Sequence, residues 1–183
     1  VKCNNSNTTG ISFSTVNTGG STTYSWTNDQ PSIGLAASGS GTIPAFNAVN
    51  NGTSPVVATI VVTPSYTNGG TSCNGPTKTF SITVNPTGQV NQPSNQVLCD
   101  NTNTTNILFG TNKSGGTTTY SWTNNTPSIG LPASGSGDIL SFTATNSGRV
   151  AKTATIVVTP TFSFGATSCQ GPTKTFTITV NPT

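Results

Sequence analysis

Apolar and polar residues alternate in several short windows of the chain. In its first half the alternating apolar residues are Ile11 and Phe13, Tyr24 and Trp26, Ala58, Ile60 and Val62, and Phe80, Ile82 and Val84. A period of two over four to eight residues is typical of a half-buried β-strand. No window of helical length carries apolar residues at the spacing of a helix face. The pattern therefore predicts an all-β chain.

Segments rich in glycine and asparagine separate these windows, at residues 17–20, 38–41 and 68–70. Glycine and asparagine accept the positive φ angles that tight turns require. Residues 38–41 lack the Lys-Ser/Thr ending of a nucleotide-binding loop, and no helix is expected after them. We expect all three segments to be tight connections between strands.

The whole pattern occurs twice. A shift of 96 positions places residues 1–87 on residues 97–183 without a gap, with 56 identities. Two copies of this size, each with about seven short strands, fit immunoglobulin-like sandwiches of about 100 residues. We therefore predict two tandem immunoglobulin-like β-sandwich modules.

We place the two modules at residues 1–87 and 88–183, because residues 88–96 lie between the matched stretches. They form either a joint or the first edge strand of the second module. We favour the edge strand, since Pro93 has no N–H to donate and an edge tolerates that loss. The first module then lacks its own leading edge strand, and we expect the chain to be a piece of a longer protein.

Charge and hydrophobicity each argue against one kind of partner. Only 5% of the residues are charged, and the six cations are Lys2, Lys78, Lys113, Arg149, Lys152 and Lys174. They are scattered along the chain, whereas a phosphate-binding surface needs clustered cations, so we expect no nucleic-acid partner. No stretch approaches the roughly 20 apolar residues of a membrane span, so we expect no membrane insertion.

The four cysteines are expected to form structural disulfides. Because any bridge in one copy should recur in the other, the repeat favours pairing Cys3 with Cys73 and Cys99 with Cys169. A bridge across the linker from Cys73 to Cys99 is the main alternative, but it leaves Cys3 to reach the distant Cys169. A zinc site is disfavoured, because no two cysteines are two residues apart and histidine is absent. Disulfides indicate an oxidising, extracellular compartment.

The chain lacks side chains that catalysis commonly uses. Histidine and glutamate are absent, and the only acids are Asp29, Asp100 and Asp138. None of the three has an acid at the matching position of the other copy, so they look like turn and surface residues. We expect no catalytic residue, no cofactor and no metal, calcium included, because calcium needs several acidic ligands in one loop.

The aromatic residues carry two expectations. Trp26 and Trp122 occupy the place where immunoglobulin-like sandwiches bury a tryptophan, so we expect core residues. Tyr66, Phe162 and Phe164 lie in one region before the second cysteine of each copy and are candidates to face a sugar ligand. They differ between the copies, which a shared sugar site should not.

Several long strings carry a resemblance to a known family. They are Thr-Tyr-Ser-Trp-Thr-Asn, Pro-Ser-Ile-Gly-Leu, Ala-Thr-Ile-Val-Val-Thr-Pro and Lys-Thr-Phe-x-Ile-Thr-Val-Asn-Pro-Thr. The chain resembles the PKD-like repeats of very large Bacteroidota surface proteins, above all SprB-type gliding-motility adhesins. The resemblance implies an immunoglobulin-like PKD fold, type IX secretion and display in long arrays on the outer surface, without catalytic residues. Relatives often carry Trp-Asp-Phe-Gly-Asp where this chain has Trp-Thr-Asn, so no role of those acids transfers.

Two classes of function follow, and the sequence favours the first. The copies are either structural stalk repeats of a cell-surface adhesin, whose partners are neighbouring copies, or modules that bind polysaccharide or other cell-surface components. A third possibility, packing of subunits into an extracellular fibre, needs an exposed sheet edge to receive another chain's strand.

Overall fold

The computed structural model describes all 183 residues, and its regular elements are strands apart from two short 3₁₀ turns. The chain divides into two compact units, each described by itself below. The first unit comprises Val1–Pro86 with Phe164–Thr167, and the second comprises Thr87–Ser163 with Ser168–Thr183.

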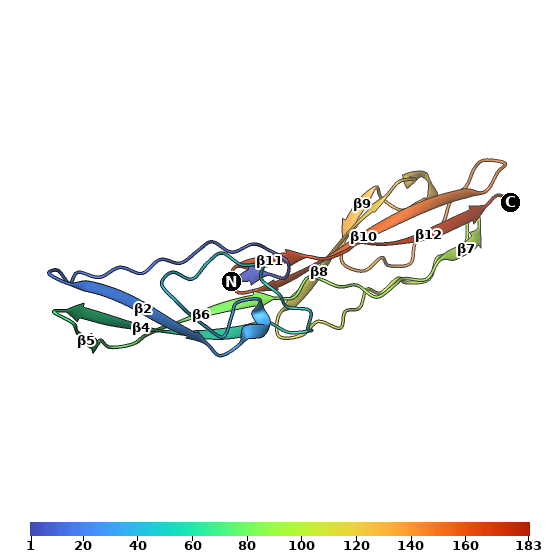
Figure 1. Cartoon of the computed structure of the whole chain (residues 1–183). Helices are drawn as coiled ribbons and strands as arrows, with labels where there is room; N and C mark the ends of the chain where they lie inside the picture. Colours follow the sequence, from blue (N-terminus) through green and yellow to red (C-terminus); the bar gives the residue numbers. More distant parts are fainter. The chain divides into compact units, whose positions relative to one another are not determined.

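The first copy contains one six-stranded sheet (Figure 1). Its strands are β1 (Lys2–Cys3), β2 (Ser21–Asn28), β3 (Ser38–Ser40), β4 (Val56–Asn68), β5 (Thr71–Asn74) and β6 (Lys78–Asn85). They lie in the order β1-β6-β4-β2-β3, and β5 also pairs with β4. The long strand β4 pairs with β2 along one edge, and with β6 and then β5 along the other.

The second copy repeats this sheet. Its strands are β7 (Gln96–Cys99), β8 (Thr117–Asn124), β9 (Ser134–Ser136), β10 (Lys152–Phe164), β11 (Thr167–Gln170) and β12 (Lys174–Asn181), in the order β7-β12-β10-β8-β9 with β11 on β10. The only helices are two three-residue 3₁₀ turns, η1 (Pro31–Ile33) and η2 (Pro127–Ile129). No helix of the chain is long and apolar enough to span a membrane.

The second layer of each sandwich is irregular. In the first copy it is made of extended chain on either side of β2 and β3, joined by single antiparallel bridges between Asn7 and Asn47 and between Ile11 and Ile43. The predicted all-β, immunoglobulin-like architecture is confirmed, with six regular strands per copy instead of about seven. The alternating pair Ile11 and Phe13 forms no regular strand, although both side chains pack against the core.

Both cores are built from the inward-facing residues of the sheet and the apolar residues of the irregular layer. The buried residues of the first are Trp26, Ile33, Leu35, Ile43, Ala48, Ala58, Ile60, Val62 and Val84. The two tryptophans are only 4% and 7% exposed, at Trp26 and Trp122. They lie on interior strands of their sheets, since β2 and β8 have a strand on each side.

The glycine-rich segment 38–41 is not the tight connection that we expected. Residues Ser38–Ser40 form edge strand β3, in which Gly39 pairs with Trp26. A Cβ on Gly39 would overlap the indole ring, and Gly135 lies in the same way on Trp122. Glycine is therefore required because the backbone lies directly against the tryptophan, which the turn propensity of glycine conceals.

Candidate functional site

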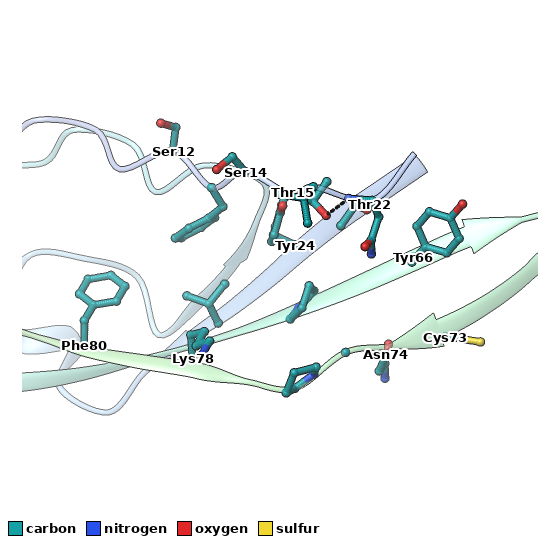
Figure 2. Close-up of a pocket in the computed structure, with 17 residues that line it drawn as sticks. Ser12, Ser14, Thr15, Thr22, Tyr24, Tyr66, Cys73, Asn74, Lys78 and Phe80 are labelled. Atoms are coloured by element: carbon teal, nitrogen blue, oxygen red, sulfur yellow. Dashed lines mark hydrogen bonds between the residues drawn. The ribbon is translucent and has the colours of Figure 1, made fainter. Parts of the chain in front are cut away.

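The candidate site is a groove in the first copy, with a volume of about 900 Å³. Figure 2 shows Ser12, Ser14 and Thr15 of the irregular layer running opposite the sheet strands that carry Tyr66 and Lys78. The lining residues are Ser12, Phe13, Ser14, Thr15, Val16, Asn17, Thr22, Tyr24, Val62, Pro64, Tyr66, Cys73, Asn74, Gly75, Pro76, Lys78 and Phe80. The groove is thus bounded by the two layers of a single sandwich.

The walls of the groove are mostly apolar, with a few polar atoms. The rings of Phe13 and Tyr24 lie 5.4 Å apart between centroids. Lys78 is the only charged side chain of the lining. The hydroxyls of Thr22 and Tyr24 are buried and have no hydrogen-bond partner. Buried polar atoms without a partner are uncommon in native proteins.

The corresponding tyrosine hydroxyl of the second copy does have a hydrogen-bond partner. Tyr120, the counterpart of Tyr24, forms a side-chain hydrogen bond with Thr111. Burial raises the pKa of Tyr120, the hydrogen bond with Thr111 lowers it, and the charge of Asp138 raises it slightly. The two copies therefore differ in the hydrogen bonding of this tyrosine, although the residue is the same in both.

In the second copy the same place is filled by the chain itself. The backbone N–H of Gly88 donates to the carbonyl oxygen of Cys169 at 3.0 Å, and that of Asn91 donates to Gly110 at 2.8 Å. Between them, Val90 is only 2% exposed and belongs to the second core. Residues 88–95 form no regular strand, since their remaining hydrogen bonds to the module use the side chains of Gln89, Gln92 and Asn95.

Burial of the neighbouring residues follows this difference. Phe176 is 2% exposed and Ile178 is fully buried, whereas Phe80 and Ile82, at the matching positions of the first copy, are only partly buried. Val16, on the rim of the empty groove, is 95% exposed. The groove is therefore a gap in the core of the first copy, at the place where the second copy packs residues 88–91.

The three aromatic residues expected to face a sugar do not form a shared site. Tyr66 lines the groove, and its hydroxyl donates to the carbonyl oxygen of Thr18 at 2.8 Å. Phe162, its counterpart, is fully buried, so the prediction that it faces a ligand is wrong. Phe164 is 39% exposed on the surface. The signal was present in the sequence, because the period-two alternation of Ile156 and Val158 along β10 extends to Phe162 and places it on the buried face.

The three acids act as backbone acceptors. Asp29 accepts from the N–H of Thr59 at 2.6 Å, and its counterpart Asn125 accepts from Thr155 at 2.8 Å. Asp100 likewise accepts from Asn146, just as Asn4 does from Asn50. Asp138 accepts from Phe109. Aspartate and asparagine exchange between copies because each supplies the same acceptor oxygen. No group of three His, Cys, Asp or Glu side chains is placed to hold a metal ion.

The cysteines do not pair as expected. Cys3 and Cys169 are disulfide-bonded, whereas Cys73 and Cys99 are exposed free thiols. Neither predicted bridge, Cys3 to Cys73 or Cys99 to Cys169, therefore forms.

The register of the first sheet gives the reason. Cys3 pairs with Asn85, the last residue of β6, and the preceding residue Val84 pairs with Val56 of β4. Cys73 pairs with Tyr66, which also lies on β4. These positions are ten residues apart along β4, or about 33 Å at the rise of a strand. A disulfide needs Cα atoms about 4.4–6.8 Å apart. Two cysteines at opposite ends of one module cannot meet.

Comparison with known proteins adds little to this description. No protein-family model matches the chain, and no curated protein does. Among solved structures, the chain is similar to the crystal structure of human mucin-like protocadherin EC1-2, with 10% sequence identity and a TM-score of 0.33. The similarity covers 100% of this chain and 94% of that one. A TM-score this low carries no argument, so the fold rests on the strand order and packing described above.

Proposed function

We propose that the chain consists of two structural spacer repeats of a secreted cell-surface adhesin, used in gliding motility or surface attachment. The repeats carry no catalytic function and extend the protein away from the outer membrane to which it is attached. Export follows the type IX secretion route that the resemblance implies. Their partners are the neighbouring copies in the same chain.

The path of the chain through the second module is the observation that supports this proposal. The chain enters at Gly88, where an added Cβ would lie 2.6 Å from the carbonyl oxygen of Pro160. It leaves at Asn181, next to Val180, which pairs with Lys152. Lys152 and Pro160 are eight residues apart on β10, about 26 Å along the strand. Each module of this kind moves the chain from one end of the sandwich to the other, as a spacer requires.

Two features of the side-chain chemistry agree with this function. The disulfide-bonded Cys3 and Cys169 favour an oxidising compartment outside the cell. The three acids are used as backbone acceptors, which leaves no carboxylate pair for acid-base chemistry. A module with these side chains contributes shape and stability to the protein.

Polysaccharide binding is the competing function, and the groove of the first copy is the feature that favours it. Tyr66 lines the groove and is the aromatic ring on which a sugar could stack. The second copy has no such groove, because residues 88–91 fill it and Phe162 is buried. A binding function shared by the repeats is therefore the weaker proposal, and assembly into a fibre has no specific observation in its favour.

Chains with two, four and six copies of the repeat would test the spacer function by small-angle X-ray scattering. The maximum dimension should rise by a constant increment for each added copy. A control chain with a long Gly-Ser linker at each joint should scatter as a flexible string of the same modules. Compact particles that do not lengthen with added copies would contradict the proposal, and saturable binding on a glycan array that Tyr66→Ala removes would support the competing function.

A further inference from the structure

We infer that the groove of the first copy is a docking site for an extended segment of the same kind as residues 88–95, supplied by another copy of the repeat. This inference deepens the spacer function proposed above, because it names the chemistry that completes one module with chain from its neighbour. The segment that the second copy packs into itself defines what the first copy lacks.

The positions that hold the segment in the second copy recur in the lining of the groove. Residues 88–91 contact Gly110, Pro160, Cys169 and Gly171. The repeat counterparts of these four are Ser14, Pro64, Cys73 and Gly75, and all four line the groove. The backbone that would receive the segment is already in place, since Gly75 N–H donates to Pro64 at 2.9 Å, just as Gly171 donates to Pro160 at 2.9 Å.

The occupant must have two chemical features. Its first residue must be glycine, because an added Cβ on Gly88 would lie 2.6 Å from a carbonyl oxygen of the receiving strand. Its third residue must be apolar, because Val90 is 2% exposed against the core. In the first copy that side chain would cover Phe80 and the rings of Phe13 and Tyr24, which are now partly buried.

One substitution between the copies narrows the groove. Ser14 replaces Gly110, and an added Cβ on Gly110 lies 3.0 Å from the side-chain amide nitrogen of Asn91. That amide is the far end of a flexible side chain, so it can move aside without displacing the backbone of the segment. The occupant therefore keeps its register, with the Asn91 side chain turned outwards.

The decisive experiment adds the segment in cis. Residues 88–96 are fused directly before Val1 of the full chain, which restores the spacing between residues 88–96 and Val97 in the second copy. The fusion supplies the segment at high effective concentration, so a weak interaction is still detected. The first copy should then unfold several degrees higher. The amide of Val16 should also exchange at least tenfold more slowly, because its counterpart Asn112 donates to the Gln89 side chain at 2.8 Å.

Two matched variants make the result specific. In the first, aspartate replaces valine at the position of Val90 in the added segment, and the gain should vanish because a carboxylate cannot enter an apolar core. In the second, Gly75→Ala places a methyl group where the segment must lie, as a Cβ on Gly171 would overlap the carbonyl oxygen of Gly88. In the chain without the fusion, that methyl only approaches Pro64 Cγ at 3.1 Å, so folding should be retained.

The synthetic peptide Gly-Gln-Val-Asn-Gln-Pro-Ser-Asn is the second measurement. It should bind the unfused chain saturably by NMR titration, with shifts at residues 12–17, and at least tenfold more weakly to the Gly75→Ala variant. If the fusion neither stabilises the first copy nor protects Val16, or if the Asp and Gly75→Ala variants gain as much as the parent, the inference is wrong. Displacement of the fused segment by a polysaccharide would also overturn it and make the groove a sugar site. The scattering test of the spacer function does not depend on any of these outcomes.

Discussion

The irregular layer of each sandwich forms no regular hydrogen-bond ladder. In each copy a single asparagine side chain supplies hydrogen bonds in its place. Asn146 is 2% exposed, and its amide donates to the carbonyl oxygens of Val180 at 2.8 Å and Val150 at 2.9 Å. Its own oxygen accepts from the N–H of Gly148 at 3.1 Å. One side chain thus ties the loop before β10 to the end of β12, and Asn50 does the same in the first copy.

The substitution Asn146→Ala should destabilise the second module by about 3 kcal/mol, because it leaves several backbone groups, one of them buried, without partners. Urea unfolding followed by hydrogen exchange of the β10 and β12 amides measures the loss. Ser147→Ala, at the exposed neighbouring position, is the control and should change stability by less than about 0.5 kcal/mol. Equal effects of the two substitutions would show that the asparagine network is not required.

The cysteines give a second prediction for single residues. The native, non-reduced protein should contain two thiols that react with Ellman's reagent, because Cys73 and Cys99 are free and exposed. Cys73→Ser should lower the count to one, and the double variant with Cys99→Ser to none. Cys3 and Cys169 should react only after reduction. A count of zero in the native protein would show that Cys73 and Cys99 are also bridged and would contradict this prediction.

At the level of the strands, the edge strand β3 depends on a glycine that lies flat on a tryptophan. Gly39→Ala should destabilise the first module by about 1–3 kcal/mol, since the added methyl overlaps the indole of Trp26 and the core must shift. Gly135→Ala should do the same to the second module through Trp122. Tryptophan fluorescence during urea unfolding measures both changes.

Ser38→Ala is the matched control for Gly39→Ala, because Ser38 lies on the same strand and is exposed. Its effect should stay within about 0.5 kcal/mol. If Gly39→Ala is no more damaging than Ser38→Ala, then β3 does not pack on the tryptophan and residues 38–41 serve as the connection that their composition indicates.

The strands with regular alternation were predictable from the sequence. The windows around Trp26, Ile60 and Ile82 became β2, β4 and β6, and in each the alternation marks the buried face. The window at Ile11 and Phe13 has the same alternation but makes a single bridge. Alternation reports burial of one face and does not report whether a neighbouring strand is present to complete a ladder.

The site and the cysteines were less predictable, for a reason of geometry. The repeat shows that Cys3 matches Cys99 and Cys73 matches Cys169, but equivalence of position carries no distance. The length of β4 decides which cysteines can meet, and it became visible only with the register of the sheet. The groove was not predicted, because its lining by Tyr24 and Phe80 arises only when the two layers of the sandwich pack together.

On the scale of the whole chain, the two copies have unequal cores. The second buries Val90, Phe176 and Ile178 almost completely, whereas the first leaves Phe80 and Ile82 only partly buried. Fully burying one large apolar side chain contributes about 1.5–3 kcal/mol. The first copy should therefore be less stable than the second by a few kcal/mol, although more than half of their residues are identical.

Unequal cores predict two unfolding steps within one chain. Pulsed hydrogen exchange during thermal unfolding should show the amides of β2, β4 and β6 opening at a lower temperature than those of β8, β10 and β12. Fusing residues 88–96 before Val1 should bring the two steps together, because it gives the first copy the side chain that the second already holds in Val90. Fusing an equally long Gly-Ser segment should leave them apart. Simultaneous unfolding of both copies in the unfused chain would mean that the groove costs the first module no stability, and that packing elsewhere compensates for the missing segment.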